Sequence, residues 1–329
     1  MTGNVNACGS PRGNSNGLLD VIVVNWNAGE LLVKCVNSVF HSVNAGELLG
    51  RVIVVDNGSV DESLRAVEVS DDPRLTVIRN KENIGFAAAC NQGVRFGGSK
   101  FILFLNPDVV LEPDVLDRTS RVMLEKENSN VAICGIQLRD NAGNVARTCC
   151  RRPTVATMFA QAIGIDRLSV GRNVTYIMKE WDHLETRFVH HVIGAYYMIR
   201  REVFEAIRGF DERFFMYFED LDLSTRVAGA GWKCLYIADV TSWHEGGGTS
   251  KRILGKRLFY SISSRVQYAF KHFGVSGGSV VCAGSVLIEP FTRVFVLLTR
   301  REFSAIRFTF DGYVLVLKWL INGGNRHIE

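Results

Sequence analysis

The chain has 329 residues, of which 47% are hydrophobic and 22% are charged, and its formal net charge is +4. This composition is ordinary for a globular protein with a substantial core, and the length predicts two domains or one large domain with an appendage. The charge is uneven: residues 251–329 contain twelve Lys/Arg and four Asp/Glu (+8), whereas the other 250 residues contain twenty-six basic and thirty acidic side chains (−4). The basic, aromatic-rich C-terminal part therefore indicates an anionic surface or partner.

The N-terminal tail and the cysteines bear on the cellular compartment. Residues 1–17 are rich in Asn, Gly and Ser without an apolar run, so we expect a disordered tail and no secretory signal. The eight cysteines lie mostly inside apolar runs and form no C-x-x-C pair, which favours reduced thiols. Both observations predict a cytoplasmic protein.

Short apolar runs alternate with helical patterns through the first third of the chain. Runs at 18–24, 51–55, 75–78 and 101–105 are typical of buried strands, and each ends in a polar loop. Amphipathic or alanine-rich patterns lie between them, at 31–39 and after residue 85. The alternation predicts an α/β domain with a mostly parallel central sheet flanked by helices. Ligands of such sheets bind at the carboxyl ends of the strands, where these polar loops lie.

The loop after the first strand lacks the usual phosphate-binding glycines. It reads Asn25-Trp26-Asn27-Ala28-Gly29, which is neither a P-loop nor a dinucleotide fingerprint. A metal is then the simplest partner for a phosphate. Asp108 follows a buried strand and suits Mg²⁺ or Mn²⁺, although Asn-Pro-Asp by itself is an ordinary turn.

The middle of the chain is less regular. Residues 137–188 break the alternation, and their basic run at 147–152 fits either a bound anionic group or a solvated face. We predict further strands at 189–199 and 232–237, followed by the segment that ends at His244.

Residues 214–223 read Phe-Phe-Met-Tyr-Phe-Glu-Asp-Leu-Asp-Leu, an apolar run that leads into three carboxylates. Acidic residues in a first helical turn are favoured by the helix dipole, and Asp222 can pair with Arg226 one turn later. The alternative is a catalytic base at the carboxyl edge of the sheet.

Four motifs in order resemble the family 2 inverting glycosyltransferases with a GT-A fold, and within them the bacterial rhamnosyltransferase-like branch. The motifs are Asp56-Asn57-Gly58-Ser59-x-Asp61; Asn83-x-Gly85-Phe86-Ala87-x3-Asn91; Leu105-Asn106-Pro107-Asp108; and the segment from Gly209-Phe210-Asp211-Glu212 through Glu219-Asp220-x-Asp222-Leu223. The resemblance covers residues 18–275, and several motifs in order are more specific than any single one.

The resemblance assigns the donor side. Asp56 would bind the pyrimidine base of a nucleotide sugar, and Asn25 and Asn27 would border the same pocket. A second set would line the nucleotide and sugar pocket, with a tight turn and a helix cap as the alternative reading: Asn83, Gly85, Asn91 and Asn106.

It also assigns the metal and the chemistry. Asp108 would be the last acidic residue of the family's D-x-D motif, whose first position here is Asn106, and His244 would be a second ligand of Mg²⁺ or Mn²⁺. Asp220 would be the base in a single inverting displacement. The acceptor side would include Glu219, Gly194 and Ala195.

The partners follow from the same resemblance. The donor would be a dTDP- or UDP-sugar, with rhamnose from dTDP-rhamnose as the leading expectation and galactofuranose or another hexose as the alternative. The acceptor would be a glycan or a polyprenyl-pyrophosphate-linked glycan of the cell envelope, and no nucleic acid is expected. Two other classes stay open: a sugar-phosphate nucleotidyltransferase and a non-catalytic nucleotide-sugar-binding protein.

Residues 276–329 form a basic, aromatic-rich segment that we expect to be helical. Glu289, Pro290 and Arg293 interrupt its apolar stretches, so we expect no run of eighteen apolar residues and no spanning helix. Two readings stay open: peripheral attachment to the inner face of the cytoplasmic membrane, or a helical subdomain packed on the catalytic domain or on a dimer partner.

Overall fold

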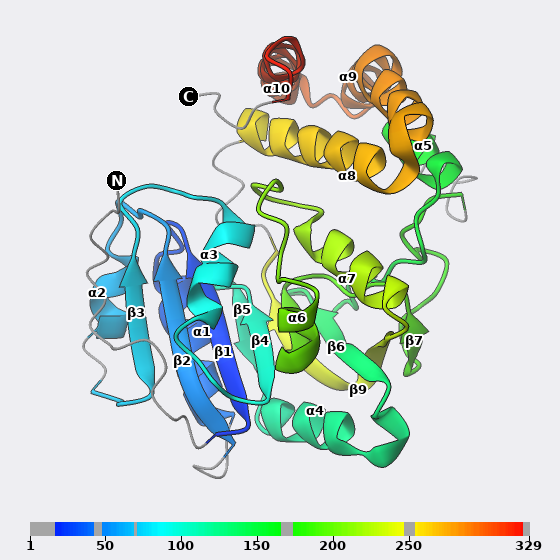
Figure 1. The fold of residues 1–329 in the computed structure, drawn as a ribbon. Coiled ribbons are helices and arrows are strands. Elements are labelled where there is room, and N and C mark those ends of the chain that lie inside the picture. The colour runs from blue at the N-terminus through cyan, green and yellow to red at the C-terminus, as the bar shows by residue number, and fades with distance from the viewer. Residues whose placement is uncertain (1–16, 43–47, 69–70, 166–173, 247–253, 325–329) are drawn as a thin grey trace.

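A computed structural model describes residues 17–42, 48–68, 71–165, 174–246 and 254–324. The predicted disordered tail, apart from Gly17, lies outside the described residues. Figure 1 shows a central sheet with helices on both faces and a layer of C-terminal helices beyond one edge.

The sheet has nine strands in the order β3-β2-β1-β4-β8-β6-β9-β5, with β7 paired to β9. Strands β1, β2, β3 and β4 are parallel to one another, and β6 is parallel to β9. Strand β8 is antiparallel to both β4 and β6, whereas β5 and β7 are antiparallel to β9. The predicted mostly parallel sheet is therefore confirmed. The strand bounds are β1 Leu19–Asn25, β2 Leu49–Asp56, β3 Leu75–Arg79, β4 Phe101–Leu105, β5 Val109–Leu111, β6 Val131–Arg139, β7 Arg187–Val189, β8 Tyr196–Arg200 and β9 Lys233–His244.

The central strands are apolar along their whole length because helices cover both faces of the sheet. In β1, Val21 and Val23 pack with α1 and α4 on one face, whereas Ile22 and Val24 pack with α3, α6 and α7 on the other. The helix bounds are α1 Glu30–His41, α2 Ser63–Glu68, α3 Phe86–Val94, α4 Val115–Leu124, α5 Val155–Ala162, α6 Arg201–Ala206, α7 Glu219–Gly229, α8 Leu254–Ala283, α9 Glu289–Thr299 and α10 Phe303–Ile321.

The predicted single strand at 189–199 was wrong. Residues 187–189 form β7 and pair with β9, the chain turns at 194–195, and β8 then pairs with β4 and β6. The segment changes strand partners within a few residues, so it cannot remain one extended strand. The apolar sequence could not show this change of partners.

The C-terminal helices form one continuous layer. Helix α8 bends at Gly274 (φ 67°) and continues through a π-helical turn, Gly284–Ile288, into α9. Helix α10 packs back on α8 through Tyr313, Val316 and Trp319. The boundary that we predicted at residue 275 therefore falls inside α8, next to the bend.

Among the described residues, the helical run Leu254–Thr299 contains a stretch long and apolar enough to cross a membrane, and most of that stretch is not buried inside the protein. The sequence contains no uninterrupted run of eighteen apolar residues, as expected, but this stretch is apolar enough even with its charged residues, so the expectation of no spanning helix stays a prediction. Glu289 and Arg293 interrupt the sequence, but they do not interrupt the helix. Inside the protein Glu289 is buried and pairs with both Arg265 and Arg293.

Candidate active site

Asp220 lies in the first turn of α7, at the edge of the sheet where the parallel strands end. Its Oδ2 accepts the N–H of Gly194 at 2.8 Å, and its Oδ1 accepts the N–H of Leu221 at 2.8 Å. The side chain keeps 16% of its surface exposed, so both fixed orientation and access are present. The two residues before α7, Tyr217 (φ 69°) and Phe218 (φ 67°), have left-handed backbones, a strain that is concentrated at functional sites in other proteins.

A hydrogen-bonded bridge connects Asp220 to the loop that carries Asp108. The N–H of Asn106 donates to the carbonyl of Ala195 at 3.0 Å, and the neighbouring Gly194 donates to Asp220. Gly194 is also closely packed, because an added Cβ would lie 3.0 Å from Asp220 Oδ2. The structure thus brings together Asn106, Gly194, Ala195 and Asp220, which the sequence predicted separately.

His191 was missed by sequence reasoning and lies beside Asp220. Its Nε2 is 3.7 Å from Asp220 Oδ2, and its Nδ1 is 3.0 Å from the hydroxyl of Ser224. Burial lowers the pKa of His191, although the charge of Asp220 acts in the opposite direction. A neutral imidazole therefore borders the carboxylate. The only sequence signal was the pair His190-His191 before Gly194.

Glu219 is a buried neighbour of the carboxylate. Burial, and then the charge of Asp220, raise the pKa of Glu219 well above its usual range, which favours the protonated carboxyl. Its Oε2 is buried and makes no hydrogen bond within the described part of the chain. An unpaired carboxyl group of this kind is unfavourable by itself and suits a site that receives a polar ligand.

Asp108 and His244 are adjacent because β5 pairs antiparallel with the end of β9, where Val109 is opposite His244. His244 Nε2 lies 3.3 Å from Asp108 Oδ1, and this buried nitrogen makes no hydrogen bond within the described residues. No group of three or more His, Cys, Asp or Glu suited to a metal occurs among the described residues. The pair fits a divalent ion whose other ligands would be phosphate oxygens and water.

At the ends of β1 and β2, a polar cluster fixes the first loop. Asn25 Nδ2 donates to Asp56 Oδ1 at 2.7 Å, and Asp56 Oδ2 accepts the N–H of Ser59 at 3.1 Å. Asn27, in the left-handed region at φ 53°, accepts the N–H of Val60 through its Oδ1. The three residues predicted for the base pocket therefore lie together and are held by their own hydrogen bonds.

A second polar cluster joins the ends of β2 and β3 to the start of α3. Asn57 Nδ2 donates to Asn83 Oδ1 and to the carbonyl of Gly85, both at 3.1 Å, while Asn80 Nδ2 donates to Asn57 Oδ1 at 3.0 Å. Asn57 and Asn80 were not among the predicted site residues. Their signal was their place in the polar loops directly after two strands.

Gly85 and Asn91 anchor the aromatic segment that precedes α7. Gly85 has φ 90°, and an added Cβ would lie 2.8 Å from the carbonyl oxygen of Phe215. The amide of Asn91 both donates to the carbonyl and accepts from the N–H of Phe210, at 2.9 and 3.0 Å. Both residues thus position the chain around residues 210–215.

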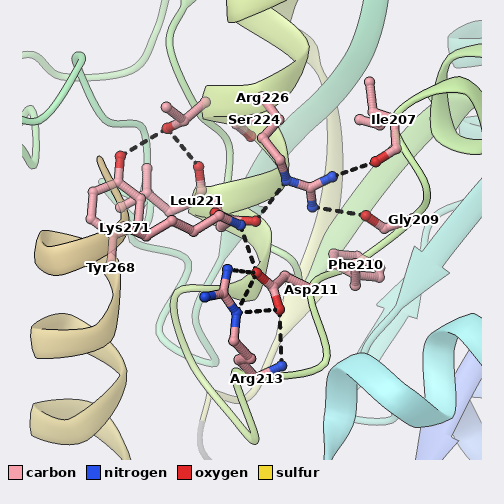
Figure 2. A network of polar contacts seen from close by, with 12 residues as sticks. Ile207, Gly209, Phe210, Asp211, Arg213, Leu221, Ser224, Arg226, Tyr268 and Lys271 are labelled. Atoms are coloured by element: carbon pink, nitrogen blue, oxygen red, sulfur yellow. Dashed lines mark hydrogen bonds and ion pairs between the residues drawn. The ribbon is translucent and has the colours of Figure 1, made fainter. Parts of the chain in front are cut away.

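Asp222 is fully buried and anchors α8 to α7. It pairs with Arg226, as predicted, at 2.8 Å, and also with Lys271 at 2.6 Å and His272 at 2.7 Å. Burial by itself would raise the pKa of Asp222, but the His272 hydrogen bond and the two cations lower it. Figure 2 shows Lys271 reaching the Asp211–Arg213 pair, while Arg226 donates to the carbonyls of Ile207 and Gly209.

Comparison with known proteins identifies the class. The model of glycosyl transferase family 2 matches residues 20–208, more than half of the chain. The chain therefore belongs to glycosyl transferase family 2 and is a glycosyltransferase, and the predicted resemblance is confirmed. The nucleotidyltransferase and the non-catalytic binding protein are set aside.

Two relatives and one solved structure illustrate the similarity. The chain is 25% identical over 248 residues to N-acetylglucosaminyl-diphospho-decaprenol L-rhamnosyltransferase of Mycobacterium tuberculosis, covering 71% of this chain and 78% of that protein. It is 28% identical over 168 residues to rhamnosyltransferase WbbL of Escherichia coli, covering 51% and 61%. The mannosyltransferase PcManGT of Pyrobaculum calidifontis, solved with GDP-Man and Mn²⁺, superimposes with a TM-score of 0.55 at 18% identity, covering 94% and 90% of the two chains. This likeness confirms the GT-A fold.

Proposed function

We propose that this glycosyltransferase moves a sugar from a nucleoside diphosphate sugar to a lipid-linked acceptor in cell-envelope polysaccharide synthesis. Rhamnose from dTDP-rhamnose is the preferred donor, because two similar proteins are named rhamnosyltransferases and one of these names specifies a diphospho-decaprenol acceptor. A galactofuranosyl or other hexosyl transfer from a UDP-sugar is the second candidate. The reaction takes place on the cytoplasmic side of the membrane.

The bridge Asn106–Ala195–Gly194–Asp220 is the observation that carries the proposal. It ties the loop of Asp108 to the carboxylate of Asp220, so groups for the diphosphate and for the acceptor share one edge of the sheet. Transfer requires a base for the acceptor hydroxyl and positive charge for the leaving diphosphate. Asp220 would supply the base, and a divalent ion held at the Asp108 loop would supply the positive charge.

Asp220 is assigned as the base that takes the proton of the attacking acceptor hydroxyl. The N–H groups of Gly194 and Leu221 fix the orientation of its carboxylate, while its partial exposure leaves an approach for the acceptor. Glu219, as a neutral carboxyl, would donate a hydrogen bond that orients a sugar hydroxyl. A single displacement with one base inverts the anomeric centre.

Asp108 and His244 are assigned as the protein ligands of a divalent ion, Mg²⁺ or Mn²⁺. When bound, the ion would supply positive charge beside the leaving diphosphate. Because an imidazole is a softer ligand than a carboxylate, we expect Mn²⁺ to bind more tightly than Mg²⁺. Asp56, Asn25, Asn27 and Asn83 are assigned to the nucleotide pocket.

The assignment of Asp220 is tested by Asp220→Asn, which preserves the shape of the side chain but removes the base. We expect transfer to fall by roughly 10³-fold or more, with donor affinity by calorimetry within about threefold of wild type. Asp239→Asn, at an exposed carboxylate on β9, is the matched control and should keep full activity. Turnover like that of the wild type in Asp220→Asn would overturn the assignment.

The donor is identified by a panel of dTDP-, UDP- and GDP-sugars, each with Mn²⁺ or Mg²⁺. Thermal stabilisation by dTDP-rhamnose above the other donors supports the proposal, because a ligand that binds only the folded state raises its stability. Stabilisation by a UDP-hexose alone would replace rhamnose with the second candidate.

A further inference from the structure

The outer side of the C-terminal helices carries two regular apolar stripes. At the end of the long helical run, apolar side chains that are 48–74% exposed recur at intervals of four, four and three residues: Leu287, Phe291, Phe295 and Leu298. On α10, side chains that are 48–83% exposed repeat with helical spacing: Phe303, Phe310, Val314, Leu317 and Ile321. These spacings place each set on one face of its helix. We call the two sets together the outer apolar face.

Helix α10 has a second apolar face that is already used. Tyr313, Val316 and Trp319 are buried against Phe259, Ile262 and Val266 of α8. A surface helix of a soluble protein normally has one apolar stripe facing the core and a polar outer side. Within the part of the chain that the structure describes, these side chains stay exposed, and exposed apolar side chains gathered on one face are typical of an interaction surface.

Basic side chains border the outer apolar face. Arg300, Arg301, Arg307 and Lys318 are exposed within or between α9 and α10. Exposed apolar side chains next to Lys and Arg match a membrane surface with anionic headgroups, in which each basic residue adds attraction. A partner surface without negative charge would gain no electrostatic attraction from these basic side chains.

We propose that the outer apolar face docks on an anionic lipid membrane, with α9 and α10 lying in the headgroup region of one leaflet. The inference deepens the proposed function, since it adds a lipid surface beside the site of a lipid-linked acceptor. Vesicle binding requires neither donor nor acceptor, so it can fail or succeed independently of that function.

Helix α8, on which α10 packs, is hydrogen-bonded to the segment that carries Asp220. The hydroxyl of Ser264 on α8 donates to the carbonyl of Met216 at 2.9 Å, and Tyr268 and Thr225 share a hydrogen bond of 2.8 Å. In Figure 1, α9 and α10 lie beyond α8, on the side away from the sheet. A membrane bound there would lie near the catalytic edge without entering it.

Packing inside the protein argues for docking in the plane of the membrane and against a crossing. Gly277 and Gly284 lie against Val155 and Phe159 of α5, so close that an added Cβ would be 2.8 Å from each side chain. Nearby, the fully buried Glu289 pairs with the buried Arg265 and with the partly exposed Arg293. A crossing helix that contains Glu289 and Arg293 would have to break these contacts and move both charged groups into hydrocarbon, away from Arg265.

The test is flotation of the full chain with vesicles of phosphatidylcholine alone or with 30% phosphatidylglycerol. We expect binding to the anionic vesicles and, in Phe291→Ser/Phe295→Ser, at least tenfold weaker binding. Arg300→Gln/Arg307→Gln should weaken binding roughly tenfold on anionic vesicles and leave zwitterionic vesicles unaffected. Equal binding of all variants would overturn the proposal.

Matched controls separate docking from folding. Leu124→Ser/Leu184→Ser replaces exposed apolar residues of the catalytic domain, and Arg65→Gln/Arg95→Gln replaces exposed basic ones; both should bind like wild type. Far-UV circular dichroism and melting temperature identify variants that fail to fold. If the Phe291/Phe295 variant fails to fold, Phe310→Ser/Leu317→Ser tests the apolar stripe on α10 instead and should also weaken vesicle binding.

Two outcomes would replace the proposal with another. In the first, wild type is a dimer by light scattering, Phe291→Ser/Phe295→Ser is a monomer, and neither wild type nor any variant binds vesicles. That result would mean that a second copy of the chain covers the outer apolar face. If protein in cell membranes resists alkaline carbonate and is released only by detergent, the helix crosses the bilayer. Release by carbonate supports the in-plane arrangement.

Discussion

At the scale of single residues, the site contrasts two carboxyl groups that are neighbours in the chain. Asp220 has two N–H donors and solvent access, whereas Glu219 is buried with an unpaired oxygen. Burial and the charge of Asp220 raise the pKa of Glu219 well above its usual range, whereas the N–H donors of Gly194 and Leu221 orient the Asp220 carboxylate. The sequence shows two adjacent acids and cannot distinguish their surroundings.

The neutral state of Glu219 makes Glu219→Gln a test at two pH values. Since the folded pKa is raised, the favourable contribution of Glu219 is present below its unfolded pKa and is lost as the pH rises toward the folded one. We expect the Gln variant to be about 1–2 kcal/mol more stable than wild type at pH 8 and equal to it at pH 4, by urea unfolding. Glu127→Gln on the surface should show no such difference; a Gln variant that gains nothing at pH 8 would mean an ionised Glu219.

Substitutions at Gly85 test whether the close approach of Phe215, in addition to the positive φ angle, requires glycine at this position. Gly85 (φ 90°) contacts Phe215, whereas Gly143 (φ 82°) has nothing within 4 Å of an added Cβ. We expect Gly143→Ala to cost about 1 kcal/mol of unfolding free energy and Gly85→Ala about 3 kcal/mol, with loss of activity as residues 214–218 are displaced. Equal costs in chemical unfolding would contradict the steric contribution.

At the scale of elements, α7 and α8 act together. Helix α7 supplies Asp220, and the buried Asp222 two residues later binds Lys271 and His272 of α8. A buried carboxylate requires such partners, because an unpaired charge is strongly destabilising. The position of the base thus depends on a helix about fifty residues further along the chain.

Lys271→Met tests this connection. Asp222 would keep Arg226 and His272 but lose a charge at 2.6 Å, so we expect a loss of about 2 kcal/mol in unfolding free energy and a lower kcat. Lys256→Met, an exposed substitution on the same helix, is the control and should cost less than about 0.5 kcal/mol. If both variants unfold alike, the ion pairs do not stabilise the interface between α7 and α8.

At the scale of the whole molecule, buried neutral histidines link stability to pH. Burial lowers the pKa of His183 and His191, and it lowers that of His190 to about 4, where the neighbouring His191 and Arg152 also disfavour a positive charge. His190 and His191 contact Thr225 and Ser224 of α7, whereas His183 packs against Trp181 and Tyr236. Protonation of these histidines would therefore disturb more than one part of the fold.

The direction of the pH effect follows from proton uptake. Between about pH 6.5 and pH 4 the unfolded chain binds a proton at His190 and the folded chain does not, so stability falls as the pH falls. The lowered pKa values of His183 and His191 act in the same direction. We expect at least about 2 kcal/mol less unfolding free energy at pH 5 than at pH 7.5. His190→Gln should reduce this difference, whereas exposed His41→Gln should not; an unchanged pH profile in His190→Gln would exclude its contribution.

The sequence alone determined the alternation of strands and helices, and with it the edge where ligands bind, because burial on two faces leaves continuous apolar runs. It also determined the family through motifs at strand ends. Only the tertiary structure showed His191 beside Asp220, Lys271 on Asp222, the broken strand at 189–199, and an apolar outer side on α10. Each of these depends on which distant segments meet or stay uncovered, and local periodicity does not contain that information.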